Sequence, residues 1–202
     1  NPTSSLLTVS AHLATVRFHF INQEEGTKYY PTIQHQELGP VKPARDEAHL
    51  ITIKPCWLMV KGHLFQFTDN LDGKKLKPFL SRGSLQIPKR SEPEFYRKFI
   101  PQIIESHRVE ASGFAIKKQE AAPTPVLCLT RDLESRPAFL LTFSYGKDFE
   151  FYAHEARPHK VNLFEEQGSY QFYKVNRDTA TEEAFVEQLR MEGLSNYQGS
   201  YF

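Results

Sequence analysis

This sequence contains few cysteines and has almost no net charge. The 202 residues include two cysteines, Cys56 and Cys128, and each lies within an apolar stretch. Free cysteine in such surroundings behaves as a small hydrophobic residue, so we expect two buried, unpaired thiols. The 25 Lys and Arg residues nearly equal the 24 Asp and Glu residues, which leaves a formal net charge of +1. Any basic surface therefore has to be local.

The chain also lacks long apolar runs. No segment approaches the roughly 20 apolar residues of a transmembrane helix, and no signal-peptide pattern opens the sequence. We therefore expect a soluble, cytoplasmic protein with no membrane partner. The chain begins with Asn1 rather than methionine and ends with the apolar pair Tyr201-Phe202. We expect it to be part of a longer parent chain.

Motifs for catalysis or metal binding are missing as well. Gly73-Lys74-Lys75 lacks the upstream glycine and the Lys-Ser/Thr pair of a phosphate-binding loop. His154 and His159 lie five positions apart with Pro158 between them, so they cannot share one helix face as zinc ligands do. No Gly-x-Ser-x-Gly nucleophile elbow occurs. The sequence predicts that this part of the parent chain is not an enzyme and holds no metal or cofactor.

Aromatic residues and strand-like alternation are abundant instead. The chain has 16 Phe, 9 Tyr and 1 Trp, and hydrophobic residues make up 40% of it, enough for a packed core. Val16, Phe18 and Phe20 alternate with polar residues, a period of two that predicts a half-buried strand. Trp57–Val60 and Leu64–Phe67 flank Lys61-Gly62, where the glycine can take positive φ, and this predicts a tight hairpin. Short strand-like segments, beginning with Val109–Ile116, recur over residues 109–175. We expect an α+β fold of mostly antiparallel sheet, built from hairpins and a meander.

Two segments have helical spacing. A capping sequence at Ser91–Glu94 is followed by apolar residues at helical intervals, which predicts a helix near 92–106. Pro101 removes a backbone donor inside it, so we expect a kink or a division into two short helices. A closing helix is expected near 179–192, capped by Asp178 or Thr179.

The segment 37–47 contains two prolines, a glycine and five charged residues, and predicts a boundary between parts of the chain. We expect an N-terminal hairpin segment over residues 1–40, a β-rich domain over 48–194 and a tail over 195–202 that leads into the rest of the parent. The residues expected in the core are Trp57, Phe65, Phe67, Phe95, Phe99, Ile103, Phe114, Leu127, Phe143, Phe151 and Leu189.

One stretch, residues 74–98, is strongly basic. It holds eight cations and two acids, Glu92 and Glu94, so its net charge is 8 − 2 = +6. Cations interleaved with aromatic residues suit phosphate contacts, and we take all eight as candidate nucleic-acid-binding residues. The alternative is a solvated face whose cations pair with acids of the closing helix, such as Glu182 and Glu187. The candidates are Lys74, Lys75, Lys77, Arg82, Lys89, Arg90, Arg97 and Lys98.

Several blocks of the sequence resemble a known family in the same order. They are Leu58–Val60, Leu64-Phe65, Asp72–Leu80, Ile87-Pro88, Phe95–Ile100, Glu110–Phe114, Leu140–Gly146 and the segment from Arg177-Asp178 to Gly193-Leu194. Together these blocks, over roughly residues 50–194, are similar to the accessory region N-terminal to the motor of bacterial SWI/SNF-type, helicase-like ATPases.

The resemblance implies a non-catalytic accessory domain of an ATP-dependent DNA helicase or translocase. Such a domain would position duplex DNA, which it binds weakly and without sequence preference, dock on the motor lobes of the same parent chain, or receive a partner protein. In that family the motor lobes bind ATP and magnesium and hydrolyse the ATP. The alternative is a stand-alone, β-rich ligand- or protein-binding module of an envelope or phage protein, with exposed Tyr29, Tyr30 or Trp57 as its platform.

Overall fold

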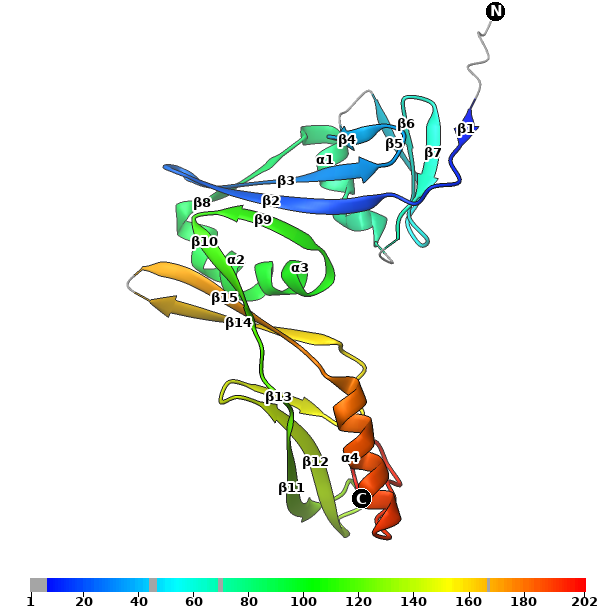
Figure 1. The fold of residues 1–202 in the computed structure, drawn as a ribbon. Coiled ribbons are helices and arrows are strands. Elements are labelled where there is room, and N and C mark those ends of the chain that lie inside the picture. Colours follow the sequence, from blue (N-terminus) through cyan, green and yellow to red (C-terminus); the bar gives the residue numbers. More distant parts are fainter. Residues whose placement is uncertain (1–6, 44–46, 69–70, 167) are drawn as a thin grey trace, which may run out of the picture. The chain divides into compact units, whose positions relative to one another are not determined.

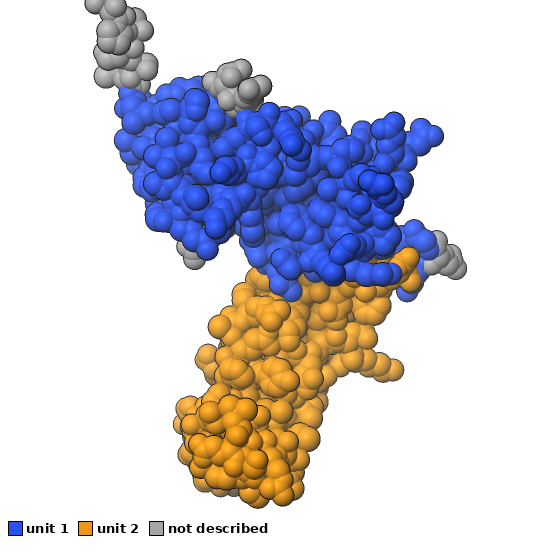
Figure 2. Space-filling model, turned by 180° about the vertical axis from the view of Figure 1, so that it is seen from behind, with its two compact units in different colours: residues 1–115, 166–170 blue, residues 116–165, 171–202 orange. Residues whose placement is uncertain are grey.

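The computed structural model describes residues 7–43, 47–68, 71–166 and 168–202. The chain forms two compact units, which Figure 2 distinguishes by colour: unit 1 comprises residues 1–115 and 166–170, and unit 2 comprises residues 116–165 and 171–202. Strands make up 49% and helices 21%, and most strand pairs are antiparallel, so the expected α+β fold is confirmed. None of the described helices is long and apolar enough to cross a membrane.

Unit 1 contains a five-stranded sheet, with β4-β3-β2-β9 in order and β8 paired to β3 (Figure 1). Its strands are β2 (Thr15–Gln23), β3 (Gly26–His35), β4 (Gly39–Val41), β8 (Leu85–Pro88) and β9 (Arg108–Ser112). Strands β2 and β3 form the expected hairpin, whereas β9 joins β2 in parallel. Gly26 has φ +141°, and a Cβ there would lie 2.0 Å from the carbonyl oxygen of Ile87. Only glycine fits where β8 passes this turn.

A second sheet of unit 1 has the order β1-β7-β6-β5. Its strands are β1 (Thr8–Val9), β5 (Ala48–Thr52), β6 (Trp57–Val60) and β7 (His63–Gln66). Lys61 and Gly62, between β6 and β7, have φ values of 49° and 80°. Positive φ at both central residues is typical of the two-residue turn that matches strand twist, and the sequence predicted this hairpin.

The helices of unit 1 fall between β7 and β9. They are η1 (Gly73–Lys75), α1 (Lys77–Arg82), η2 (Lys89–Ser91), α2 (Glu92–Lys98) and α3 (Ile100–Ser106), where η marks a 3₁₀ helix. The helix expected near 92–106 is divided at Phe99, with Pro101 in the first turn of α3. That position tolerates proline because its N–H would have no helical partner. The ring of Tyr96 on α2 lies 4.3 Å from that of Tyr170, centroid to centroid.

The boundary expected within 37–47 lies inside unit 1, because this unit continues from the hairpin to Ala115. The aromatic core explains the continuity. Tyr29 of β3 contacts Phe79 of α1 and Phe99 between α2 and α3, with ring centroids 4.9 and 5.6 Å apart. Residues before and after the proline-rich segment therefore share one core.

Unit 2 is centred on the three-stranded sheet β11-β12-β13 and a long helix. These elements are β11 (Thr124–Arg131), β12 (Pro137–Tyr145), β13 (Phe149–Tyr152) and α4 (Thr179–Met191). Leu141, Phe143 and Phe151 are buried with Leu189 of α4 in one cluster. Helix α4 matches the expected closing helix, and the Asp178 carboxylate caps it by accepting from the N–H of Thr181 at 3.1 Å.

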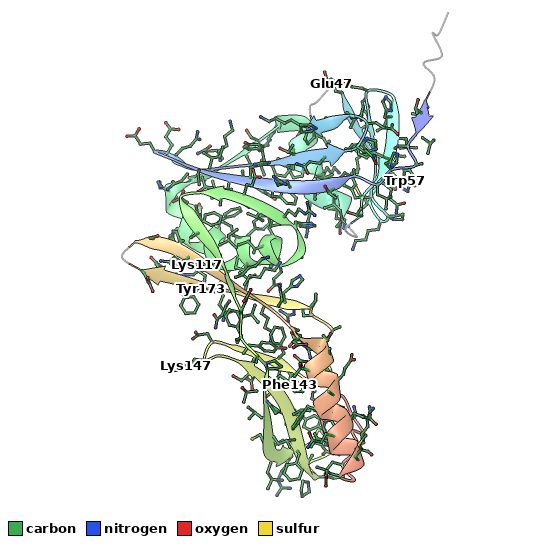
Figure 3. The ribbon with its side chains drawn as sticks, viewed as in Figure 1. Glu47, Trp57, Lys117, Phe143, Lys147 and Tyr173 are labelled. Atoms are coloured by element: carbon green, nitrogen blue, oxygen red, sulfur yellow. The ribbon has the colours of Figure 1, made fainter. Side chains whose placement is uncertain are left out.

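Another sheet, with the order β10-β15-β14, has most of its residues in unit 2. Its strands are β10 (Phe114–Gln119), β14 (His159–Glu166) and β15 (Ser169–Asn176). Lys117 and Tyr173, both labelled in Figure 3, lie on neighbouring strands, and the Lys117 ammonium is 5.4 Å from the Tyr173 ring centroid. The single strand expected from Val109 to Ile116 is divided at Gly113, where φ is +98°.

The structure corrects several expectations for unit 2. Leu127 is 39% exposed rather than in the core, and Cys128 is exposed, whereas Cys56 is buried. The expected tail 195–202 instead packs on β12: Phe202 is buried and exchanges backbone hydrogen bonds with Phe139. Among the other expected core residues, Trp57, Phe95 and Phe99 are half-buried and the remaining seven are buried.

The turn between β11 and β12 predicts a measurable pH dependence. Burial alone would raise the pKa of Asp132, but hydrogen bonds from the Arg136 backbone and side chain, from Tyr197 and from the Glu134 N–H outweigh it and lower the pKa to about 2. The unfolded chain has an Asp pKa of about 3.9. The stabilisation by ionised Asp132 is therefore complete above the unfolded value and is lost as pH falls through about 2.

We expect Asp132→Asn to remove this part of the acid sensitivity. Urea unfolding of the wild type and of Asp132→Asn, measured from neutral pH down into this window, is the test. The stability difference between them should shrink as pH falls. A difference that stays constant with pH would contradict a role for the carboxylate charge.

Candidate nucleic-acid interface

Helix α1 places basic side chains on its outer face. Phe79 is buried beneath the helix, while Lys77 and Arg82 are exposed. The preceding turn η1 is capped by Asp72, whose carboxylate accepts from the N–H of Lys74 at 2.9 Å. This hydrogen bond and the nearby Lys54 lower the pKa of Asp72. The cap orders the segment and leaves the exposed Lys74 side chain beside α1.

One groove lies between α1 and β5, and we call it the α1 groove. Its volume is about 840 Å³. The basic side chains of Lys74, Lys77 and Arg82 line it. Apolar residues complete the lining, and among them Ile51 and Ile53 are 52% and 40% exposed. The α1 groove thus combines three cations with an open apolar floor.

A second pocket, which we call the Tyr30 pocket, adjoins the first because both include Ser81 and Arg82. Its volume is about 510 Å³, and Lys28 and Lys42 contribute two further cations. Gly83, also in its lining, has φ +69° and ends α1, so the chain turns sharply into Ser84. Ser81 and Ser84 complete the polar part of the lining.

Tyr30 forms the aromatic wall of this pocket. Its ring stacks on His19, with centroids 4.8 Å apart and planes 8° apart. The ammonium groups of Lys42 and Lys28 lie 5.1 and 6.0 Å from its centroid. Burial lowers the pKa of His19 despite the carboxylate of Glu110 3.2 Å away. The imidazole that supports Tyr30 is therefore neutral at pH 7.

The two pockets bring five cations together, which we call the basic cluster: Lys28, Lys42, Lys74, Lys77 and Arg82. No acidic residue lines either pocket within the described part of the chain. In the same part of the chain, none of the five side chains forms an ion pair. Cations that form no ion pair are able to neutralise phosphates, whereas paired cations first have to break a salt bridge.

Three of the eight candidate residues from the basic stretch belong to this cluster, namely Lys74, Lys77 and Arg82. Arg90 and Arg97 are exposed but line neither pocket. Lys89 and Lys98 form ion pairs with Glu92 and Glu94 at 3.2 and 2.8 Å. That these residues bind nucleic acid stays a prediction.

The remaining candidate, Lys75, is half-buried, and its Nζ lies 3.0 Å from Nε2 of His107. Burial lowers its pKa, which makes it the least suited of the eight to a phosphate contact. The acids proposed as alternative partners of the basic stretch have partners within unit 2: Glu182 pairs with Arg177, and Glu187 with Arg190.

Lys28 and Lys42 were not among the candidates, because they lie far from the basic stretch in sequence. One signal was available for Lys28. It stands two positions before Tyr30 in a strand, so the two side chains share a face. Tyr29 points the other way and is buried, at 2% exposure, so it cannot serve as an exposed platform. No comparable signal marks Lys42, which follows β4 in a connector.

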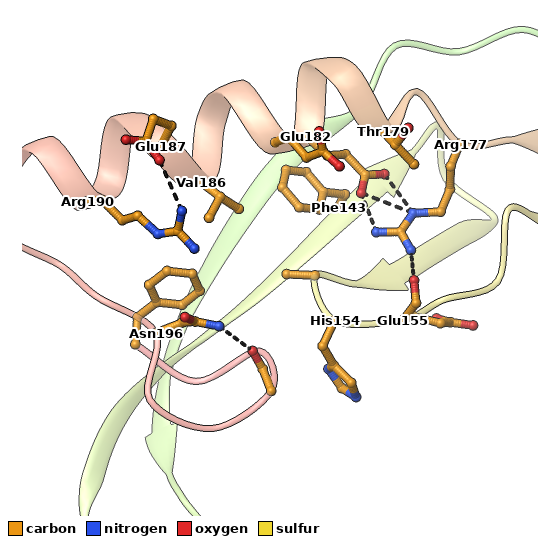
Figure 4. Close-up of a pocket in the computed structure, with 14 residues that line it drawn as sticks. Phe143, His154, Glu155, Arg177, Thr179, Glu182, Val186, Glu187, Arg190 and Asn196 are labelled. Carbon is orange, nitrogen blue, oxygen red and sulfur yellow. Dashed lines mark hydrogen bonds and ion pairs between the residues drawn. The ribbon is translucent and has the colours of Figure 1, made fainter.

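Unit 2 has a pocket of its own, shown in Figure 4, with a volume of about 590 Å³ beside α4. His154 and Glu155 line it, but Nδ1 of His154 lies 2.6 Å from Oγ of Ser200, which also accepts the His154 N–H at 3.0 Å. Ser200 thus holds the C-terminal segment in place. In the described residues, no group of three His, Cys, Asp or Glu side chains is arranged to hold a metal ion.

Comparisons of the chain with protein-family models, with curated proteins and with solved structures find no match. The basic cluster therefore has to be interpreted from its own chemistry.

Proposed function

We propose that unit 1 binds the backbone of duplex DNA through the basic cluster. The observation that carries the proposal is the convergence of five cations from β3, the connector after β4, η1 and α1 on two adjoining pockets without an acidic lining residue among those described. Contacts of this kind position a protein on DNA and carry no sequence information. Binding is therefore weak, non-specific and sensitive to salt.

The same proposal extends to the parent chain. A weak DNA contact is useful to a domain tethered to a motor, because tethering raises its effective concentration. We propose that the chain is a non-catalytic accessory domain of a SWI/SNF-like DNA translocase, in keeping with the family resemblance of residues 50–194. ATP and magnesium would be held by the motor lobes of the parent. The reading frame downstream of this segment tests that part: a helicase-type ATPase motor supports it, and its absence overturns it.

A ligand-binding module is the second candidate function, and the Tyr30 pocket favours it. A half-buried aromatic ring beside two lysines also suits a small aromatic anion. Fluorescence anisotropy with a labelled DNA duplex at low salt separates the two functions. Saturable binding that rising salt abolishes supports DNA binding, and no binding at the lowest salt overturns it.

A further inference from the structure

Strand β11 is an apolar strand at the edge of its sheet. In the order β11-β12-β13 it pairs with β12 on one side only, and Figure 1 shows β11 on the outside of β12. Within Thr124–Thr130 there is no charged residue. Val126, Leu127 and Leu129 are 42%, 39% and 69% exposed. An exposed apolar edge of this length is a template for another strand.

The hydrogen bonds of β12 show which backbone groups of β11 point toward β12 and which point outward. The N–H of Leu141 donates to Ser200, and its carbonyl accepts from Ala153, so Leu141 points away from β11. Backbone groups alternate along a strand, and the even-numbered residues of β12 therefore point toward β11. In the register Cys128↔Leu140, it is the even-numbered residues of β11 that bond to β12. The Asp132 N–H, which donates to the Arg136 carbonyl at 2.9 Å, continues the same pattern.

The odd-numbered residues of β11 consequently direct their N–H and C=O groups outward. These are Pro125, Leu127, Leu129 and Arg131. Proline has no N–H, and an outward position on an edge strand is where its absence breaks no hydrogen bond within the sheet. Across the register, Leu127 lies beside Leu141 and Leu129 beside Phe139. Both leucine side chains are thus on the face that holds the core, where an added strand would cover them.

We propose that the free edge of β11 pairs antiparallel with β11 of a second copy of this chain, about a twofold axis at Cys128. Outward groups lie on odd-numbered residues, so Leu127 pairs with Leu129 of the second copy and Leu129 with Leu127. Each pair exchanges two hydrogen bonds. The N–H of Arg131 donates to the carbonyl of Pro125 in the second copy, which completes six bonds. A neighbouring register centred on Leu127 would instead place Pro125 of each copy opposite Leu129 of the other. Both of these pairs would then lack the hydrogen bond that an N–H at position 125 would donate.

Charge also favours a second copy of this strand. In the antiparallel register the cationic Arg131 lies opposite Pro125 rather than opposite another arginine, and the leucines lie opposite each other. Like charges directly opposite one another would destabilise the pair, whereas apolar cross-strand pairs stabilise it. Such an isologous contact closes on itself and yields a dimer. The inference is independent of DNA binding, because every residue used belongs to unit 2.

Sedimentation of the full chain over a range of concentrations is the first test. We expect a reversible dimer, and we expect Leu129→Lys to raise the dissociation constant about tenfold or more, since the change occurs twice at the twofold interface. Met191→Lys is the matched control: Met191 is 79% exposed but lies on α4. The control should dimerise as the wild type does. A chain that stays monomeric, or a dimer that Leu129→Lys leaves unchanged, overturns the proposal.

Thiol cross-linking tests the register. Residues facing each other in a non-hydrogen-bonded antiparallel pair have Cα atoms ~4.5 Å apart, within reach of a disulfide. With copper(II)-phenanthroline as the oxidant, which accepts the two electrons as two protons leave, Cys128 should cross-link to Cys128 of the second copy. Val126→Cys/Cys128→Ser keeps an exposed thiol on the same side of the strand but opposite Thr130, so it should cross-link far more slowly. Equal rates for the two proteins overturn this register.

Discussion

Replacing Lys42, Lys74, Lys77 and Arg82 together with glutamine is expected to weaken duplex DNA binding about hundredfold or more at low salt. The reason is that unpaired cations lining the two adjoining pockets supply the phosphate contacts. Four engaged phosphates would give the wild type a slope of log affinity against log salt near −3.6, at ~0.9 per phosphate. The variant should lose most of that slope. Fluorescence anisotropy at several salt concentrations measures both quantities.

The matched control removes the same charge from exposed cations that belong neither to the basic cluster nor to the other candidates: Lys61, Arg108, Lys118 and Lys147, each changed to glutamine. If net charge alone drives binding, the two variants lose affinity equally, and the basic cluster is not the interface. If the control binds as the wild type does, the cluster carries the contact. Neither set should change the melting temperature much, because exposed charges contribute little to stability.

Arg177→Leu is expected to destabilise the protein by about 3–5 kcal/mol, the cost of leaving a buried carboxylate without its partner. The Arg177 Nε donates to both carboxylate oxygens of Glu182 at 3.0 Å, and the two side chains are 5% and 4% exposed. The guanidinium also donates to the carbonyl of Glu155 and holds the segment before β14 to the start of α4 (Figure 4). Burial opposes the charge of Arg177, but the hydrogen bonds and charge of Glu182 outweigh it and raise its pKa.

A second variant separates lost charge pairing from lost packing. In Arg177→Leu/Glu182→Gln no charge is left buried, and the amide oxygen can still accept from the Tyr145 hydroxyl, as Glu182 does at 2.5 Å. We expect this double variant to recover a large part of the lost free energy of unfolding in urea titrations. A deficit that is equal in both variants would contradict this explanation.

Local sequence signals predicted the elements well where neighbouring residues decide the structure. The Lys61-Gly62 turn and the Asp178 cap each depend on a few adjacent residues, and both occur where expected. The division of the helix near Phe99 followed from Pro101 in the same way. Such features depend on backbone conformation and nearby hydrogen bonds, which the sequence specifies directly.

Features that depend on long-range pairing were not predictable. An apolar run such as Val126–Leu129 suggests a buried strand, but its exposure depends on whether a strand lies on both sides, and β11 is an edge strand. The basic cluster presents the same difficulty. Lys42 lies outside the basic stretch 74–98, and only the fold of unit 1 brings it close to α1.

The division into units also determines when each unit can finish folding during synthesis. Residues 166–170 belong to unit 1, although about 50 residues of unit 2 separate them from Ala115, and Tyr170 supplies the ring against Tyr96. A ribosome adding roughly 5–20 residues per second needs several seconds to cross that interval. During this time the buried Tyr96 has the ring of Phe114 beside it but lacks that of Tyr170, so unit 1 cannot complete its packing before much of unit 2 has emerged. A truncation after Ala115 would leave unit 1 permanently in that unfinished state.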